Sequence, residues 1–482
     1  MIQKHNLSKS FFWKFLERFS VQGTQFLIQI ILARLLTPEH YGALAIMMIF
    51  INISNVIIQN GFNTSLIQNK DATDEDFSSV FWLLLAISTL VYILLYFSAP
   101  FLASYYHMPY LEEPFKILCL MLIPGALNSV QLAIIRRKMD FKKEFKSNVV
   151  SIIISGVAGI SCAYLNFGLW ALVIQVLLNN TIACITMWHV VGWRPQFVFN
   201  FTKVKILFSY GYKLVLAGLL DSLSNDLSAF IIGAKYNASS LGYYTRGKLF
   251  PSGIMGVLNS AVQSVMLPAL ASLQDNRDEA KKVMRNAMIL SAFCVFPMMA
   301  ILAGVAKPMV LFLLTDKWLE CVPYIQIFCF SFAFWPVHTS NLQAINAMGR
   351  SDIFLKLEIY KKIMAWTCLA FAVFYFDTPL AIAGIGMLTT LISCFINSYP
   401  NKYLLNYSYS EQMKDILPYF FLSLLTFVLV NSLDSINDNL LVVLLLKSIV
   451  GCCFYTLIAS VLKLKACIKI MERIKSKFYE KK

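Results

Sequence analysis

Residues 77–100 read FSSVFWLLLAISTLVYILLYFSAP, a run that contains no Asp, Glu, Lys, Arg or His. A helix needs about 20 apolar residues to span the hydrocarbon core of a bilayer. Inside lipid a helix also satisfies its own backbone hydrogen-bonding groups, which an isolated extended segment cannot do. The run therefore predicts a membrane-spanning helix.

Comparable runs fill the chain from end to end. Hydrophobic residues make up 58% of its 482 residues and charged residues only 14%. The turns between the runs are too short to hold a soluble domain, so we expect an all-α, polytopic membrane protein with about fourteen transmembrane helices. The expected helices cover 11–35, 41–63, 77–100, 114–135, 146–165, 168–190, 206–233, 241–273, 281–304, 320–347, 353–376, 380–405, 414–432 and 438–462.

The positions of the basic residues that give the net charge of +15 are typical of membrane topology and do not indicate a nucleic-acid site. Lys and Arg crowd into alternate loops, and the loops between them hold few. Because positively charged loops stay in the cytoplasm, this alternation predicts that both termini are cytoplasmic. We expect the basic tail to be a topology anchor or a contact for anionic lipid headgroups, and we expect no nucleic-acid partner. The basic segments are 136–146, 194–205, 277–285, 350–362 and 463–482.

The eleven cysteines show no C-x-x-C pair and no Cys/His spacing typical of a zinc site. Nearly all of them fall inside or at the edge of predicted helices, where a thiol packs as a small apolar side chain. We therefore expect neither a bound metal nor structural disulfides.

Several residues recur in the same order in two halves of the chain. Each half has six predicted helices, and because six is even, both halves enter the membrane in the same direction. We therefore expect two pseudo-symmetric lobes, residues 1–200 and 201–408, related as a parallel repeat about an axis along the membrane normal. The matched residues are Pro124 and Pro336, Gln131 and Gln343, Asp140 and Asp352, and Gly42 and Gly242.

Residues 409–482 hold the last two predicted helices and a basic cytoplasmic tail. This helix pair has no counterpart in the repeat. It could be a lipid-facing appendage, an oligomer contact or a groove for a substrate's tail, and length and hydrophobicity do not separate these roles.

The first predicted helix carries a polar stripe. Arg18, Gln22, Gln25 and Gln29 follow steps of four, three and four residues, which put them on one helical face, with Glu17 beside them. An ionised side chain inside the membrane costs at least about 2.5 kcal/mol, so this face should meet water or a partner group. The stripe predicts the wall of a polar cavity. Glu17 and Arg18 could instead pair with neighbours and hold helices together.

Three further helices repeat this pattern. The seventh carries Lys213, Asp221 and Asp226, the eighth carries Arg246, Lys248 and Asn259, and the second carries Asn55 and Gln59. In a two-lobed transporter the first two helices of each half would line a shared cavity. Hydrogen bonding between helices is the alternative for the amides of the second helix. It is also the more typical role for His338, Asn341 and Gln343 on the tenth helix.

Four short motifs, in order along the chain, resemble a known family. They are LARLLTPEHYG at 32–42, GFNTSLIQ at 61–68, RKMDF at 137–141 and LGYYTR at 241–246. Together they resemble Wzx-type bacterial polysaccharide flippases, which are members of the multidrug/oligosaccharidyl-lipid/polysaccharide exporter superfamily. The resemblance extends over effectively the whole chain, including the number of helices.

This resemblance implies a flippase that moves an undecaprenyl-pyrophosphate-linked oligosaccharide across the bacterial cytoplasmic membrane for O-antigen, capsule or exopolysaccharide synthesis. It implies alternating access coupled to H⁺ or Na⁺, with no other cofactor and no enzymatic activity. Membrane lipids and a polysaccharide polymerase complex are the further partners it implies. The implied phosphate or acidic-sugar contacts are Arg18, Lys213, Arg246 and Lys248, the implied sugar contacts are Gln22, Gln25, Gln29, Asn55, Gln59 and Asn259, and the implied ion-coupling carboxylates are Asp221, Asp226 and Glu17.

Two other functions compete with this one. A drug or metabolite exporter of the same superfamily would need an aromatic and acidic cavity for organic cations, whereas the stripes here carry mainly Arg, Lys and amides. A membrane-embedded polysaccharide polymerase or glycosyltransferase would need larger extramembrane loops with catalytic acids. The sequence has no glycine-rich phosphate loop, so we do not expect direct use of ATP.

Overall fold

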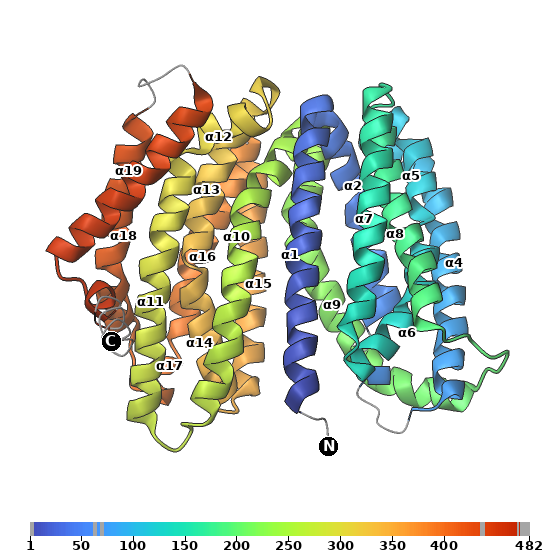
Figure 1. Cartoon of the computed structure of the whole chain (residues 1–482), viewed down its shortest axis with the longest axis horizontal. Helices are drawn as coiled ribbons and strands as arrows, with labels where there is room; N and C mark the ends of the chain where they lie inside the picture. Colours follow the sequence, from blue (N-terminus) through green and yellow to red (C-terminus); the bar gives the residue numbers. More distant parts are fainter. Residues whose placement is uncertain (1–3, 61–64, 68–71, 434–438, 470–471, 473–482) are drawn as a thin grey trace. The chain divides into compact units, whose positions relative to one another are not determined.

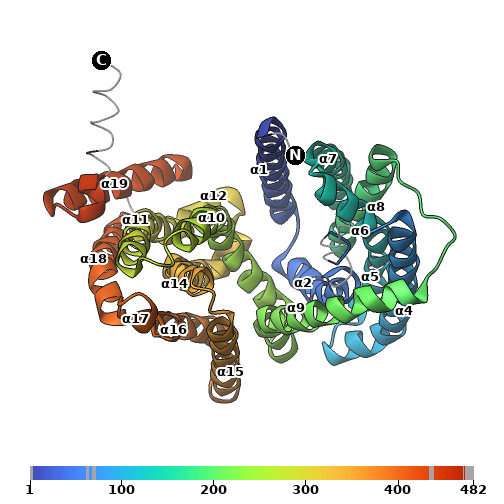
Figure 2. The same ribbon diagram turned by 90° about the horizontal axis from the view of Figure 1, so that it is seen from below.

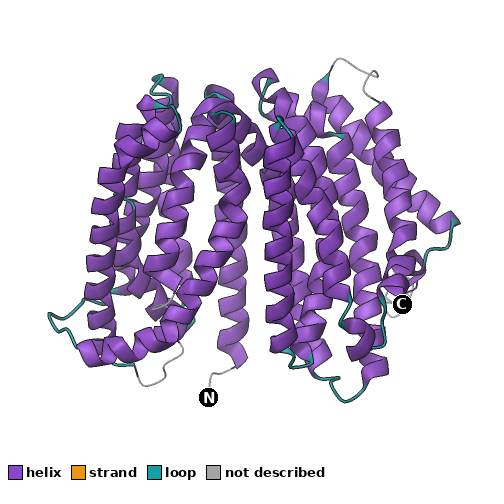
Figure 3. Cartoon of the chain, turned by 180° about the vertical axis from the view of Figure 1, so that it is seen from behind, coloured by secondary structure: helices purple, strands orange, loops and turns teal. Residues whose placement is uncertain are grey.

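The computed structural model describes residues 4–60, 65–67, 72–433, 439–469 and 472. Within these residues every regular element is a helix, and the view in Figure 3 contains no strand among them. The expectation of an all-α fold is therefore confirmed. The chain divides into two compact units, Met1–Gly242 and Tyr243–Lys482.

The first unit begins with α1 and ends within α10, which continues into the second unit (Figure 1). Its elements are α1 (Lys4–Leu35), α2 (Pro38–Asn55), the π-helix η1 (Val56–Asn60), α4 (Asp74–Tyr105), η2 (Pro109–Leu111), α5 (Glu112–Cys119), α6 (Leu122–Lys138), α7 (Phe141–Tyr164), α8 (Leu169–Val191), α9 (Phe201–Lys235) and α10 (Ala238–Ala271).

The second unit contains the rest of α10 and the remaining helices. These are α11 (Arg277–Gly304), α12 (Ala306–Leu313), η3 (Asp316–Cys321), α13 (Val322–Ala333), α14 (Trp335–Ala347), α15 (Ser351–Tyr375), α16 (Pro379–Ser398), α17 (Asn401–Leu404), α18 (Tyr409–Ser432) and α19 (Leu440–Val461).

Among the described residues, 12 helical stretches are long and apolar enough to cross a membrane. The chain is therefore a multi-pass membrane protein. The helices α1 and α15 form where the sequence predicts spans, but they are not among these 12. In α15 the charges of Lys356, Glu358, Lys361 and Lys362 lower the apolarity of the first half. The total of fourteen spans stays a prediction.

Two of the predicted helices are interrupted at matched positions. The predicted helix 114–135 is split between α5 and α6 just before Pro124. The predicted helix 320–347 is split between α13 and α14, with Pro336 at the start of α14. Proline lacks the N–H that continues a helix, and its ring crowds the carbonyl four residues earlier. The breaks therefore occur at corresponding places in the repeat that the sequence predicts.

The starts of α2 and α10 cross at very short range. A Cβ added at Gly42 would lie 1.7 Å from the carbonyl oxygen of Ala238, and one added at Gly242 would lie 2.1 Å from the carbonyl oxygen of Pro38. Gly42 thus faces Ala238, four residues before Gly242, and Gly242 faces Pro38, four residues before Gly42. Small residues allow this kind of backbone approach between membrane helices. The matched pair Gly42 and Gly242 marks one reciprocal crossing.

A buried amide network joins three helices of the second unit. Asn341 Nδ2 on α14 donates to Gln412 Oε1 on α18 at 2.9 Å, and Gln412 Nε2 donates back to Asn341 Oδ1 at 3.0 Å. Asn401 Nδ2 on α17 donates to Asn341 Oδ1 at 2.7 Å. His338 also lies on α14, and its Nδ1 forms a hydrogen bond of 3.0 Å with Asn397 Nδ2 of α16. The predicted interhelical role of His338 and Asn341 is confirmed.

An ion pair fixes α18 to α11 beside this network. Arg285 Nη2 lies 2.6 Å from Asp415 Oδ1, and Tyr407 Oη donates to Asp415 Oδ2 at 2.8 Å. Burial, together with this hydrogen bond, raises the pKa of Tyr407 above that of a free phenol. The helix α19 in turn packs on α11, α12 and α18. The last helix pair is therefore a packed part of the second unit.

Candidate substrate-binding residues

The polar stripe of the first predicted helix lies on α1. Gln22 is exposed, whereas Gln25 and Gln29 are half-buried. The neighbouring face holds α1 against α7, because a Cβ added at Gly156 would lie 2.2 Å from Ile28 Cδ1. The glutamines therefore lie beside the packed face rather than within it. The side chains of Arg18 and Glu17, also on α1, lie outside the described residues.

The charged residues predicted on the seventh helix lie on α9, which packs against α2, η1 and α4. Lys213 and Asp221 are exposed, and Asp226 is half-buried. The ammonium group of Lys213 lies 5.9 Å from the centroid of the Tyr212 ring. Eight residues of helix separate Lys213 from Asp221, a rise of about 12 Å. Opposite charges are thus exposed at two levels of one membrane helix.

In the first unit, two amides meet at the point where α2 changes into the π-helix η1. Gln59 Nε2 donates to Asn55 Oδ1 at 3.1 Å, and both side chains are half-buried. A Cβ added at Gly125 would lie 3.5 Å from Gln59 Nε2 and 3.8 Å from Asn55 Oδ1. Gly125 follows Pro124 on the interrupted helix. The amide pair therefore packs against the break, and π-turns and broken helices are both frequent at functional sites.

The second unit has a matching contact. Asn259 on α10 stands as far after Gly242 as Gln59 stands after Gly42. Its Oδ1 accepts a hydrogen bond from Thr339 Oγ1, three residues after Pro336 on α14. In each unit, the amide that lies 17 residues after the glycine therefore contacts the interrupted helix just after its proline.

Two buried oxygens on the interrupted helices were not singled out by the sequence. Asn128 Oδ1 and Ser340 Oγ are each buried and make no hydrogen bond within the described part of the protein. Asn128 lies four residues after Pro124, and Ser340 lies four residues after Pro336. Buried polar groups normally find a protein, water or ligand partner. Asn128 and Ser340 are 212 positions apart, as are Pro124 and Pro336, and this shared separation is the sequence signal that could have identified the pair.

The basic residues predicted at the start of the eighth helix differ in their surroundings. The Arg246 side chain is only 4% exposed, and its guanidinium lies 5.7 Å from the centroid of the Trp318 ring. It therefore packs α10 against η3 within the second unit. Lys248, two residues later, is half-buried. The role of both as phosphate contacts stays a prediction.

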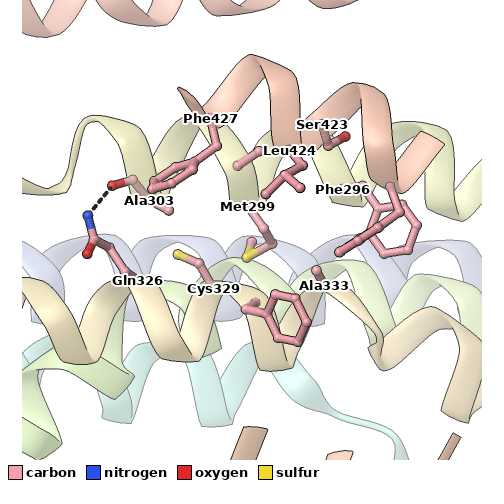
Figure 4. A pocket seen from close by; sticks show the side chains of 12 residues that line it. Phe296, Met299, Ala303, Gln326, Cys329, Ala333, Ser423, Leu424 and Phe427 are labelled. Carbon is pink, nitrogen blue, oxygen red and sulfur yellow. Dashed lines mark hydrogen bonds between the residues drawn. The ribbon is translucent and has the colours of Figure 1, made fainter. Parts of the chain in front are cut away.

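A cavity of about 140 Å³ lies between α11, α13 and α18 in the second unit (Figure 4). Its walls are almost entirely apolar, with Phe296, Leu424 and Phe427 facing the space in the figure. Gln326 is an amide at its edge, and its Nε2 donates to the carbonyl oxygen of Ala303 at 3.4 Å. None of the predicted substrate contacts lines this cavity, and its lining offers no charge for a phosphate.

All eleven cysteines carry free thiols. Across the residues that the structure describes, no group of three or more His, Cys, Asp and Glu side chains is arranged to hold a metal ion. Among the predicted site residues whose side chains the structure describes, the exposed or half-buried groups are amides, the lysines Lys213 and Lys248, and the carboxylates of Asp221 and Asp226.

The chain is similar to proteins of polysaccharide biosynthesis. The sequence profile of a family described as "Polysaccharide biosynthesis protein" matches residues 31–323. The succinoglycan biosynthesis transport protein ExoT of Rhizobium meliloti (strain 1021) is 23% identical over 408 residues, which are 84% of this chain and 80% of that protein. The lipopolysaccharide biosynthesis protein WzxC of Escherichia coli (strain K12) is 19% identical over 425 residues, 86% of this chain and 85% of that protein.

Two solved structures share the fold. The lipid II flippase MurJ, in an inward closed conformation, matches with a TM-score of 0.75 at 14% identity, over 93% of this chain and 98% of MurJ. An inward-facing multidrug resistance MATE family transporter matches with a TM-score of 0.58 at 14% identity, over 85% of this chain and 96% of that one. At this level of identity, the structures establish a common helical architecture.

Proposed function

Since the chain belongs to the polysaccharide biosynthesis protein family, within the multidrug/oligosaccharidyl-lipid/polysaccharide exporter superfamily, we propose that it is a flippase for polysaccharide precursors. The cargo we propose is an undecaprenyl-pyrophosphate-linked oligosaccharide. The membrane we propose is the bacterial cytoplasmic membrane, with both termini on the cytoplasmic side.

The observation that carries the proposal is the chemistry that the membrane helices expose. Lys213 is an exposed cation on α9, and Lys248 is a half-buried one on α10. Cations of this kind form charge-assisted hydrogen bonds with a pyrophosphate or an acidic sugar. Amides on α1, α2 and α10 offer both donors and acceptors, which suit sugar hydroxyls. Such groups would give a polar headgroup a route through the membrane while the polyprenyl tail stays in lipid.

We propose alternating access coupled to H⁺ or Na⁺ as the mechanism. Asp221 and Asp226 on α9 are the described carboxylates that could bind or release the ion, and Glu17 on α1 is the third candidate. Interrupted helices at matched places in two halves are typical of transporters that bind substrate or ion at such breaks. The contacts of Gln59 and Asn259 with the interrupted helices support this part of the proposal.

The relatives favour transport over catalysis, because ExoT is named as a transport protein and MurJ as a flippase. A drug exporter remains the second candidate, since the MATE transporter shares the fold. A polymerase or glycosyltransferase is the third candidate, and no relative named above carries such a name. A polysaccharide polymerase complex is a partner we propose from the function alone.

Lys213→Gln tests the proposal in a strain that lacks the chromosomal gene. Losing a hydrogen bond to a charged group costs about 2 kcal/mol, or roughly a 30-fold loss of substrate affinity. We expect surface polysaccharide to fall strongly at an unchanged protein level in the membrane. Lys235→Gln is the matched control, because Lys235 is an exposed lysine at the far end of the same helix. Equal polysaccharide from both variants would remove Lys213 from the site.

A dye-resistance assay on the same strains separates the second candidate. A flippase for an anionic lipid-linked sugar should not change the minimum inhibitory concentration of cationic dyes. Increased resistance that depends on this chain, with unchanged surface polysaccharide, would overturn the proposal in favour of a drug exporter.

A further inference from the structure

The connector between α8 and α9, residues 192–200, exposes apolar side chains at successive positions. Phe197 is 94% exposed, Phe199 is 51% exposed, and Phe201, at the start of α9, is 70% exposed. We call these three residues, which occupy every second position, the aromatic ridge. Val198 between them is also exposed. Exposed apolar side chains that lie next to one another mark a candidate contact surface.

The ridge is held in a fixed conformation by α4. The backbone N–H of Gln196 donates to Ser78 Oγ at 3.0 Å, and Trp82 Nε1 donates to the carbonyl oxygen of Gln196 at 2.8 Å. The Phe197 ring stacks on Trp82, with 5.3 Å between ring centroids and 26° between ring planes. The exposed phenylalanine therefore stands on a rigid base, and its exposure is a property of the folded unit.

Polar contacts hold the other end of the connector. The backbone N–H of Asn200 donates to Ser79 Oγ at 3.0 Å, and Asn200 Nδ2 donates to Glu75 Oε1 at 3.0 Å. Lys203 Nζ lies 2.8 Å from Glu75 Oε2, and this hydrogen bond raises the pKa of Lys203. The carboxylates at the start of α4 are thus occupied by the connector and by Lys203. Two exposed basic groups lie nearby, Lys205 and Arg194, and Arg194 Nη1 also donates to the carbonyl oxygens of Trp188 and Trp193.

The connector lies where two membrane spans end. The span of α8 ends at Val191, and the next candidate span is Gly211–Lys235 within α9. Figure 1 shows the connector as a loop at the lower edge of the first unit, and Figure 2 shows it passing around the outside of α4. The first turns of α9 then cross the end of the unit, side-on in the view from below. Aromatic rings beside basic groups at the end of spans fit the boundary between lipid tails and headgroups.

We propose that the aromatic ridge, with Arg194 and Lys205, binds the surface of an anionic bilayer. The ridge rings enter the boundary between acyl chains and headgroups, and the two basic side chains contact anionic phosphate groups. The surface anchors the connector that joins α8 to α9, and α4 supplies its rigid support. This inference concerns a lipid contact of the first unit and does not depend on which molecule the protein transports.

Photo-crosslinking of the full chain in membranes tests which molecules contact the aromatic ridge. p-Benzoyl-phenylalanine replaces Phe197 or Phe199, one at a time, and mass spectrometry identifies what it captures in vesicles of phosphatidylglycerol and phosphatidylethanolamine. Val157, 62% exposed within the membrane span of α7, is the control that we expect to contact lipid, and Phe115, 1% exposed, is the buried control. We expect lipid adducts at 197, 199 and 157 and none at 115. Adducts to protein, or no adducts, at 197 and 199 alongside lipid adducts at 157 would overturn the proposal.

A second experiment tests the preference for anionic lipid. The thermal midpoint of unfolding is compared between phosphatidylglycerol and phosphatidylcholine vesicles for the wild type and for Phe197→Ser with Lys205→Gln. We expect the wild type to unfold several degrees higher in phosphatidylglycerol and the double variant to lose most of that difference. Phe374→Ser, at an 85% exposed phenylalanine of α15, is the matched control and should keep it. A double variant that retains the full wild-type difference would overturn the anionic-lipid contact.

Discussion

Gly42→Ala should destabilise the protein by separating the starts of α2 and α10. The added Cβ would lie 1.7 Å from the carbonyl oxygen of Ala238 and 2.4 Å from its carbonyl carbon. Carbon–oxygen contacts between close membrane helices lie at about 3.3 Å, so the two backbones must move apart by roughly 1.6 Å. Overpacking costs about 1–3 kcal/mol, occasionally more. Because the obstacle is backbone and cannot rotate away, we expect about 3 kcal/mol.

Gly242→Ala inserts its Cβ into the other side of the same crossing, 2.1 Å from the carbonyl oxygen of Pro38. Separating the helices for one alanine makes room for the other. The double variant should therefore lose less stability than the sum of the two single variants.

The assay is unfolding of the purified protein in mixed micelles with increasing dodecyl sulfate, followed by far-ultraviolet circular dichroism. Gly253→Ala and Gly256→Ala on α10 are matched controls, because a Cβ at either position meets no atom within 4 Å. Replacing a helix-interior glycine by alanine there should stabilise by up to about 1 kcal/mol. If Gly42→Ala unfolds at the same dodecyl sulfate fraction as Gly253→Ala, the reciprocal crossing does not exist as described.

Three further predictions concern coupling and the second unit. Asp221→Asn should change the pH or Na⁺ dependence of transport into proteoliposomes if Asp221 couples the ion, and an unchanged dependence would exclude this carboxylate. Arg285→Ala should destabilise by about 1.5–3 kcal/mol, because Asp415 loses a charge-assisted hydrogen bond and keeps only the one from Tyr407 Oη; chemical denaturation checks this, and Arg285→Lys should retain part of the stability. Tyr407→Phe should cost about 1.5–3 kcal/mol near pH 7, because the Tyr407 hydroxyl donates to a charged acceptor. The folded-state pKa of Tyr407 is raised, so its contribution is present below the ordinary phenol pKa of about 10 and is lost as the pH rises through the folded value. The difference between wild type and Tyr407→Phe should stay constant between pH 6 and 9 and shrink above about pH 10, and a difference that shrinks below pH 9 would contradict the assignment.

The positions of the helices could be predicted from the sequence, because apolar runs and the polar turns between them are local signals. The predicted helix 168–190 corresponds to α8 within one residue at each end, and 146–165 corresponds to α7, which begins five residues earlier. The interruptions were not predicted, since hydrophobicity is continuous through 114–135 and 320–347. Proline alone did not identify them, because Pro297 lies inside α11 without ending it. Whether a proline bends or breaks a helix depends on the groups packed against it.

For the candidate residues too, features set by local sequence could be predicted, whereas contacts between distant segments could not. Helical spacing correctly indicated which residues share a helix, because that depends only on 3.6 residues per turn. It could not indicate that Arg246 packs on Trp318, since the partner lies far along the chain on η3. Nor could it identify the aromatic ridge, because the exposure of Phe197 depends on how Ser78 and Trp82 hold a connector that has no helical pattern.

The matched polar groups of the two units give the strongest reason to look for ligand binding at the interrupted helices. Gln59 and Asn259 differ in length, and Asn128 and Ser340 differ in functional group, yet each pair occupies corresponding positions. Burying a polar oxygen without a partner costs about 1–3 kcal/mol, so a position needed only for packing would favour an apolar side chain. Because both copies of the position keep a polar group with different side chains, we infer that a hydrogen-bonding group is required there. The groups best suited to meet such oxygens inside a membrane protein are water, a hydroxyl of the substrate or a coupling cation.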